Sequence, residues 1–249
     1  HACGHDAHMA MLLIAAKLLD KKKNELSGSI KFVFQPNEEN AGALPMIDEG
    51  VLENPTVNAA MGLHVWIPLE SGKVAIPSGP VMGGLDVFKV TIHGKGGHTG
   101  YPYQAVDPVI AAANLIQTVQ VIQTREIDQF QPTIIMFGKL NAGTKSNIIP
   151  DKVELEGSIR FLHPLDSQSE KHPTKCFERV AHNVCNTHHC TCEVKIIHEN
   201  IPLVNDPLMT DLAQRAAYEV LGCGKNICSL QTIASEDFSE FSSDRKSVV

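Results

Sequence analysis

Residues 85–93 read LDVFKVTIH, an alternation of apolar and polar side chains that predicts a β-strand with one buried face. The chain after this strand continues with further alternating runs, separated by segments in which apolar residues recur at helical spacing. The elements predicted after the first strand are a helix at 107–124, strands at 133–140 and 152–161, a helix at 167–187 and a strand at 190–198.

This order of elements, strand–helix–strand–strand–helix–strand, is that of the ferredoxin-like split motif. Such a motif closes its own core, so we expect residues 84–199 to form a self-contained domain. On both sides of it, helices and strands alternate in the manner of an α/β sheet with a large parallel component. The flanking elements are helices at 6–22, 41–49 and 206–221 and strands at 29–34 and 58–65. We therefore expect the smaller domain to be inserted into a larger one, formed by residues 1–83 and 200–249.

Composition excludes several classes of protein. The 249 residues carry 21 basic and 28 acidic side chains, a net charge of −7, and no dense run of Lys and Arg. A binder of nucleic acid or of anionic membranes needs a basic face, so we expect neither partner. The longest apolar run, residues 9–16, is too short to span a bilayer. The seven cysteines show no disulfide framework, so we expect free thiols and a cytoplasmic protein.

The first candidate site lies in the opening run HACGHDAH, residues 1–8. Cys3 and His5 are two residues apart, so in an extended turn their side chains point the same way and can bind one metal ion. Asp6 can cap the following helix or hold the His5 ring. A polar N-terminal segment that contains Cys and His by chance remains the alternative.

The second candidate is the pair Glu38 and Glu39, which follows the predicted strand 29–34. Adjacent side chains in an extended segment point to opposite sides. One carboxylate can then bind a metal ion while its neighbour acts as general base on an activated water. Two solvated acids at the N-terminus of the next helix are the alternative.

The third candidate, His64, lies near the end of the predicted strand 58–65. A histidine on an apolar strand is usually part of the core. In open α/β sheets, however, ligands bind outside the carboxyl ends of the strands, and Glu38, Glu39 and His64 all follow or end a predicted strand. We expect these side chains to converge.

Other candidates lie in the smaller domain. The run GKGGHTG, residues 94–100, does not have the P-loop order of residues, and its glycines suit a backbone that bends to present His98. Asn147 can donate a hydrogen bond to a substrate carbonyl, and Arg160 can hold a carboxylate. The alternatives are a flexible connection at residues 94–100, a turn at Asn147 and an ordinary strand cation at Arg160.

A group of Cys and His residues between 182 and 198 also suggests a metal site. Its spacing matches no standard zinc module, because the paired C-x-x-C arrangement is absent. We interpret this group as the end of a helix followed by a strand.

Six runs of sequence, in order along the chain, resemble one family: HACGHDAH, FQPNEENAGALPMIDEG, GLHVW, GKGGHTGYPYQAVDP, SNIIPDKVELEGSIR and ASEDF. The family is the amidohydrolase branch of the dinuclear metallopeptidases, which includes hippurate hydrolase, N-acyl-amino-acid amidohydrolases and indoleacetyl-amino-acid hydrolases. The resemblance covers nearly the whole chain. It implies a two-metal catalytic domain with an inserted ferredoxin-like dimerisation domain, in agreement with the pattern of elements.

The resemblance also implies roles for single residues. Cys3, His5, Glu39 and His64 match the metal ligands, and Glu38 matches the general base. His98 matches the residue that stabilises the oxyanion, often in the partner subunit's site of a homodimer. Asn147 and Arg160 match substrate contacts. Two divalent ions (Zn, Mn, Co or Ni) are the implied cofactors, and a small N-acyl amino acid is the implied substrate.

The sequence departs from the family pattern at both ends. The resemblance implies a stretch before HACGHD and a histidine ligand after ASEDF, whereas this chain begins with His1 and has no histidine after His198. We therefore expect a fragment with four of five ligands and little activity. Two alternatives stay open: a carboxypeptidase or dipeptidase that uses the same site, and a non-catalytic remnant that retains only dimerisation.

Overall fold

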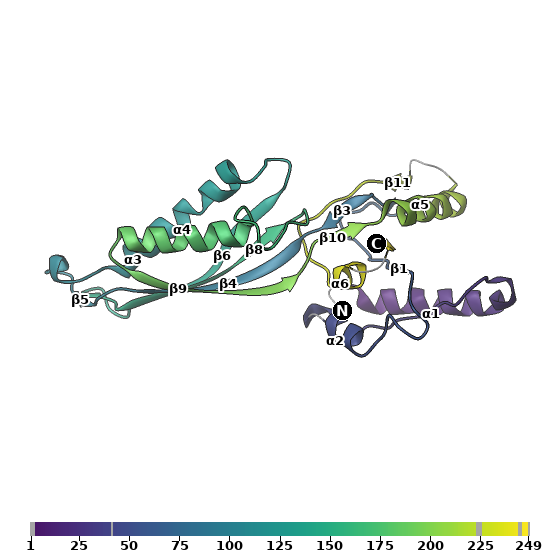
Figure 1. Cartoon of the computed structure of the whole chain (residues 1–249), viewed down its shortest axis with the longest axis horizontal. Helices are drawn as coiled ribbons and strands as arrows, with labels where there is room; N and C mark the ends of the chain where they lie inside the picture. The colour runs from purple at the N-terminus through teal and green to yellow at the C-terminus, as the bar shows by residue number, and fades with distance from the viewer. Residues whose placement is uncertain (1–2, 41, 223–225, 244–245, 249) are drawn as a thin grey trace. The chain divides into compact units, whose positions relative to one another are not determined.

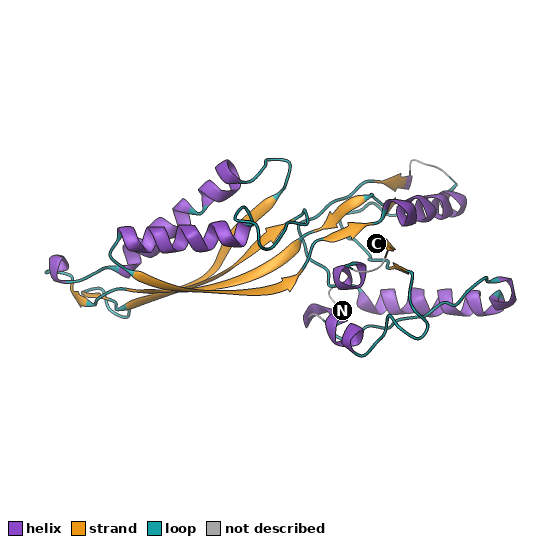
Figure 2. Cartoon of the chain, viewed as in Figure 1, coloured by secondary structure: helices purple, strands orange, loops and turns teal. Residues whose placement is uncertain are grey.

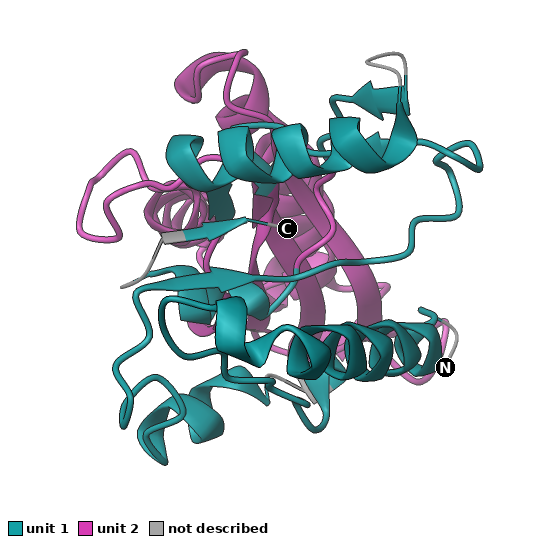
Figure 3. Cartoon of the chain, turned by 90° about the vertical axis from the view of Figure 1, so that its right-hand side faces the viewer, with its two compact units in different colours: residues 1–81, 203–231, 236–249 teal, residues 82–202, 232–235 magenta. Residues whose placement is uncertain are grey.

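The computed structural model describes residues 3–40, 42–222, 226–243 and 246–248. The chain divides into two compact units (Figure 3). The first unit contains residues 1–81, 203–231 and 236–249, and the second contains 82–202 and 232–235. The second unit is thus built almost entirely from one continuous segment, whereas the first draws on both ends of the chain.

The second unit is a four-stranded antiparallel sheet in the order β6-β8-β4-β9, with two helices on one face (Figure 1). This confirms the predicted order of elements. The bounds are β4 Gly84–His93, α3 Pro108–Thr118, β6 Thr133–Ala142, β8 Lys152–Phe161, α4 Pro173–Thr187 and β9 Thr191–Asn200. Shorter elements complete the unit: β5 Gly97–His98, η3 Pro102–Gln104, η4 Ile122–Glu126 and β7 Ile148–Ile149.

The alternation seen in β4 separates a buried face from a polar one. Phe88, Val90 and Ile92 are at most 1% exposed and belong to the core that the sheet forms with α3 and α4. The Phe88 ring lies 4.3 Å from that of Phe177 on α4. Lys89, between the buried positions, instead forms an ion pair with Glu156 on the open face of the sheet. Burial of one face therefore fixes the register of these strands.

The first unit consists of helices and short two-stranded pairs (Figure 2). β1 pairs with β12, and β2 pairs with β11, both in parallel, while β3 pairs with β10. The helices are α1 His5–Lys21, η1 Lys23–Glu25, η2 Glu38–Asn40, α2 Ala43–Asp48, α5 Pro207–Leu221 and α6 Phe238–Ser242. The strands are β1 Ala59–Met61, β2 Val74–Ala75, β3 Gly79–Met82, β10 Leu203–Asn205, β11 Ile227–Cys228 and β12 Lys246–Val248.

The predicted strand at 29–34 is wrong. This segment is extended, but among the described residues no strand pairs with it, and Ile30 and Phe34 are 47% and 43% exposed. An apolar run predicts burial, whereas a strand also needs a neighbour for its N–H and C=O groups. The predicted strand 58–65 is shorter than expected, since β1 ends at Met61 and His64 lies in the segment after it.

The predicted helix at 6–22 is confirmed as α1, which spans His5–Lys21. Within the described residues, no helix has both the length and the apolar character needed to cross a bilayer.

We expect Phe88→Ala to destabilise the second unit by about 3–5 kcal/mol, because it leaves a cavity between β4 and α4. Phe130→Ala is the matched control, since Phe130 is 78% exposed, and it should change stability by less than about 0.5 kcal/mol. Urea unfolding followed by circular dichroism measures both. Equal unfolding midpoints for the two variants would contradict the assigned core.

Candidate metal centre

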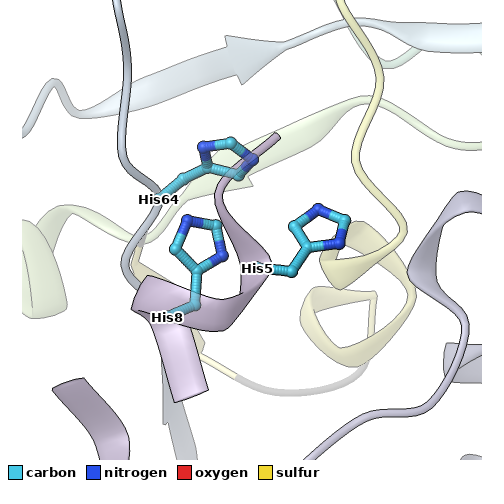
Figure 4. Close-up of side chains that lie close together, drawn as sticks. All are labelled: His5, His8 and His64. Atoms are coloured by element: carbon cyan, nitrogen blue, oxygen red, sulfur yellow. The ribbon is translucent and has the colours of Figure 1, made fainter. Parts of the chain in front are cut away.

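Eight side chains with metal-binding atoms converge within the first unit. They form three groups in which the candidate ligand atoms lie within 4.8 Å of one another. The groups are His5, His8 and His64; Cys3, His5 and Glu39; and Glu38, Glu236 and Asp237. His5 belongs to the first two groups, so the other three residues predicted as ligands, Cys3, Glu39 and His64, lie around its imidazole. Figure 4 shows the three histidines, two from α1 and one from the segment after β1.

Gly4 permits the close approach of these two segments. Its φ of +80° lies in the left-handed region, and a Cβ atom at this position would lie 2.5 Å from Cγ2 of Val65. Any other residue would therefore be strained and would also push away the segment that carries His64. The glycine between Cys3 and His5 is thus required by the packing of the site.

Backbone hydrogen bonds orient the imidazole rings of His64 and His8. Nδ1 of His64 donates to the carbonyl of Val65 at 2.6 Å, which leaves its Nε2 lone pair free to bind an ion. The Nε2 atom of His8 accepts a hydrogen bond from the N–H of Val65 at 3.0 Å. Burial, and then the neighbouring His64, hold the pKa of His8 below its usual value. His8 is therefore a neutral ring that positions the His64 segment.

The two adjacent glutamates do not point to opposite sides as expected. Oε2 of Glu38 and Oε1 of Glu39 lie 3.5 Å and 3.8 Å from the same atom, Nε2 of His5. The reason is that residues 38–40 form a turn of 3₁₀-helix instead of an extended segment. Their surroundings still differ, because the side chain of Glu38 is 25% exposed and that of Glu39 is 61% exposed. A hydrogen bond to Glu39 raises the pKa of the Cys3 thiol.

Glu236 and Asp237 bring two more carboxylates to Glu38. Glu236 is 9% exposed and Asp237 is fully buried. Burial, followed by the charge of Glu38, raises the pKa of Glu236 to about 8. Burial also raises the pKa of Glu38, with the charges of Asp237 and Glu39 acting in the same direction. This crowding of acids is an environment that a divalent cation would neutralise, and the mixed S, N and O donors suit Zn, Mn, Co or Ni.

Asp237 also holds the loop that carries Glu38 and Glu39. Its carboxylate accepts hydrogen bonds from Nε2 of Gln35, at 2.7 Å and 2.6 Å, and from the N–H of Ala43 at 2.9 Å. At the end of the loop, a Cβ on Gly42 would lie 1.9 Å from the carbonyl oxygen of Pro36. The buried carboxylate of Asp237 therefore holds the two ends of this loop close together.

Sequence reasoning did not assign His8, Glu236 or Asp237 to the site. His8 follows His5 by three positions on α1, a spacing that places both on one helix face and could have indicated it. Glu236 and Asp237 lie about two hundred positions after Glu38 and Glu39, and only their place in the run ASEDF connected them with the other motifs.

His98, Asn147 and Arg160 lie in the second unit. Nδ1 of His98 accepts a hydrogen bond from the N–H of Gly100 at 3.0 Å, and the N–H of Thr99 donates to the carbonyl of Asn147 at 3.2 Å. The paired strands β5 and β7 thus bring His98 and Asn147 together. Arg160 lies near the far end of β8, where its Nη1 donates to the carbonyl of Ile233 at 3.3 Å.

The length of β8 separates these residues within the unit. The N–H of Gly96, just before β5, donates to Oδ1 of Asp151, just before β8. Nine residues separate Asp151 from Arg160, which is about 30 Å along a strand. One copy of the second unit therefore cannot present His98 and Arg160 to the same small molecule. The functional roles of both residues stay predictions.

We expect Asp237→Ala to weaken metal binding by about 10- to 100-fold, because the loop that presents Glu38 and Glu39 loses its buried anchor. Isothermal titration of the purified chain with Zn²⁺ or Mn²⁺ measures the affinity. Asp211→Ala on α5, which removes an exposed carboxylate, is the matched control and should change nothing. Unchanged affinity in a folded Asp237→Ala chain would show that the loop does not need this anchor.

Comparison with known proteins places these observations in a family. The model of the peptidase family M20/M25/M40 matches residues 1–249. Thermostable carboxypeptidase 2 of Saccharolobus solfataricus is 37% identical over 246 residues, which are 97% of this chain and 60% of that protein. N-acetyl-L-cysteine deacetylase of Bacillus subtilis is 38% identical over 220 residues, which are 88% of this chain and 52% of that protein.

A solved structure agrees with this match. The crystal structure of a dinuclear metal-binding peptidase of the M20 family from Bacillus subtilis superposes with a TM-score of 0.81 at 28% identity. It covers all of this chain, which corresponds to 62% of that structure. The chain thus spans between about half and two thirds of the length of these relatives.

Proposed function

The chain belongs to the peptidase family M20/M25/M40, and we propose that it carries the metal centre of an enzyme that hydrolyses the amide bond of N-acyl amino acids. The observation that carries the proposal is the convergence of Cys3, His5, Glu39 and His64 beside a second, more buried carboxylate, Glu38. The similarity to an N-acetyl-L-cysteine deacetylase supports this class of substrate.

Cys3, His5, Glu39 and His64 are the residues that would hold two divalent ions. When bound, such ions act as Lewis acids that lower the pKa of a water and polarise the scissile carbonyl. The free Nε2 of His64 and the exposed carboxylate of Glu39 are suited to bind them. Zn, Mn, Co and Ni all accept this mixture of donors.

Glu38 is proposed as the general base. Its carboxylate lies within 4 Å of the same imidazole as Glu39, but it is more buried, and burial raises its pKa. A carboxylate with a raised pKa accepts a proton from the attacking water more readily and returns it to the leaving amine. Asp237 and Glu236, which lie beside Glu38, keep it in this environment.

His98 is proposed as a hydrogen-bond donor to the oxyanion. Because Nδ1 accepts from the N–H of Gly100, the proton of a neutral ring lies on Nε2. That nitrogen can donate to negative charge that develops on the carbonyl oxygen. Asn147, held next to His98 by β5 and β7, can donate to the same substrate.

The separation within the second unit supports a homodimer. One copy cannot direct both His98 and Arg160 at one N-acyl amino acid, so we propose that His98 and Asn147 act on the substrate of the partner subunit. Arg160, a candidate contact for the substrate carboxylate, then acts on a different substrate molecule from the His98 of the same copy.

The sheet offers one edge suited to pairing. β6 exposes Met136 (59%), Leu140 (50%) and one charged side chain, Lys139, which forms an ion pair with Glu156 on the neighbouring strand. The opposite edge, β9, exposes two charged side chains, Glu193 and Lys195. Charged edges oppose strand addition, and apolar edges favour it. We therefore assign the dimer contact to β6.

A carboxypeptidase is the second candidate, favoured by the similarity to thermostable carboxypeptidase 2. Both reactions cleave an amide whose leaving amine carries a carboxylate, so the same residues serve either. Hydrolysis rates for N-acetyl amino acids, hippurate and N-blocked dipeptides distinguish the two activities, because only a carboxypeptidase should prefer the N-blocked dipeptides.

In the full-length protein, we expect Glu39→Gln to lose bound metal and Glu38→Gln to keep metal but lose at least about 100-fold in kcat. Elemental analysis measures the metal, and hydrolysis of hippurate measures turnover. Glu25→Gln, an exposed site, is the control. Equal metal loss in the Glu38 and Glu39 variants would refute the division of roles.

We expect the double variant Met136→Lys, Leu140→Lys to be monomeric, because two charges on β6 oppose strand pairing between subunits. Thr191→Lys, which adds charge to the β9 edge, should leave the dimer intact. Analytical ultracentrifugation of the full chain determines both masses. If the double variant remained dimeric, the dimer contact would have to lie outside β6.

A further inference from the structure

A second cluster of reactive side chains lies in the second unit, outside the metal centre. Nδ1 of His182, on α4, lies 3.4 Å from Sγ of Cys192, on β9. The thiol of Cys185, one helical turn after His182, interacts electrostatically with that of Cys192. Cys192 therefore interacts with both an imidazole and a second thiol where the end of α4 packs on β9.

The two thiols differ in burial and in acidity. Cys185 is 1% exposed, whereas Cys192 is half-buried and its imidazole partner is exposed. The hydrogen bond from Cys185, followed by the charge of His182, lowers the pKa of Cys192 to about 7. The same hydrogen bond, with burial, raises the pKa of Cys185. This is the arrangement of a nucleophilic thiolate next to a protonated thiol.

The other described cysteines lack these features. Cys190 is the nearest in sequence, but its thiol points to the carbonyl of Asp107 at 3.9 Å, and burial raises its pKa. Burial also raises the pKa of Cys176, and the exposed Cys3 has a raised pKa beside Glu39. Exposure alone would favour reaction at Cys3, whereas acidity favours Cys192.

A metal site is the less suitable interpretation of this cluster. Three ligands must reach one ion, and the groups with candidate ligand atoms close enough, among the residues described, all lie in the first unit. Two neighbouring thiols need no third ligand to react with each other. The geometry therefore favours thiol chemistry.

We propose that Cys192 is a peroxide-reactive thiol and that Cys185 resolves it to a disulfide between α4 and β9. The Cys192 thiolate attacks one oxygen of a hydroperoxide, so an S–O bond forms, the O–O bond breaks, and the alcohol or water leaves with a proton. Sγ of Cys185 then attacks Sγ of Cys192. The S–S bond forms, the S–O bond breaks, and water leaves with the thiol proton. The two sulfurs give up two electrons, which reduce the peroxide.

The test exposes the reduced, purified chain to one equivalent of hydrogen peroxide and maps its peptides by mass spectrometry without reduction. We expect Cys185 joined to Cys192 before any other cysteine is oxidised. Cys185→Ser should stop at a sulfenic acid on Cys192, which dimedone traps. Cys192→Ser should leave Cys185 reduced. His182→Gln should slow oxidation of Cys192 about tenfold at neutral pH, because Cys192 loses the imidazole that lowers its pKa.

Cys228→Ser is the matched control, since it removes another half-buried thiol, in the first unit, and it should not alter the result. Prior oxidation of Cys3, Cys176 or Cys190 in the unmodified chain would overturn the proposal. So would dimedone labelling of Cys185 in the Cys192→Ser variant. The peptide map of the unmodified chain requires no variant, so the proposal is testable even where a substitution impairs folding.

Discussion

The buried carboxylate of Asp237 is the contact on which the candidate metal centre depends. It binds the side chain of Gln35 and the backbone of Ala43, and between these two points the chain presents Glu38 and Glu39. A buried charge is unfavourable unless it is fully hydrogen-bonded, so the loop and the carboxylate stabilise each other. The C-terminal part of the chain thereby determines the position of acids that lie about two hundred residues earlier.

The sequence predicted the second unit better than the first for a physical reason. In an antiparallel sheet with one solvated face, each strand carries its own alternating pattern, and residues 152–161 form a strand with the predicted bounds. The run at 29–34 has the apolar content of a strand but no paired neighbour in the described chain, which composition cannot reveal. An apolar sequence pattern indicates the burial of a segment more directly than it indicates whether the segment pairs with another strand.

The candidate site was predictable where its residues are close in sequence. The spacing of Cys3 and His5 and the adjacency of Glu38 and Glu39 made each pair a candidate, and their expected convergence with His64 favoured a shared site. The orientation of the glutamates was not predictable, because it depends on a 3₁₀ turn. Asp237 was missed because its partners are distant in sequence, whereas the spacing of His5 and His8 on one helix face could have indicated His8. A supporting contact between distant segments leaves no spacing that a sequence motif can show.

The two edges of the four-stranded sheet differ, and in the proposed homodimer this difference limits the size of the assembly. The proposed pairing through β6 about a two-fold axis uses the less charged edge of both copies at once. The edges that remain free are the two β9 strands, where Glu193 and Lys195 oppose the addition of another strand. In the proposed homodimer, growth by edge pairing therefore ends once the two β6 edges have paired, and a sheet with two free edges is restricted to a finite particle.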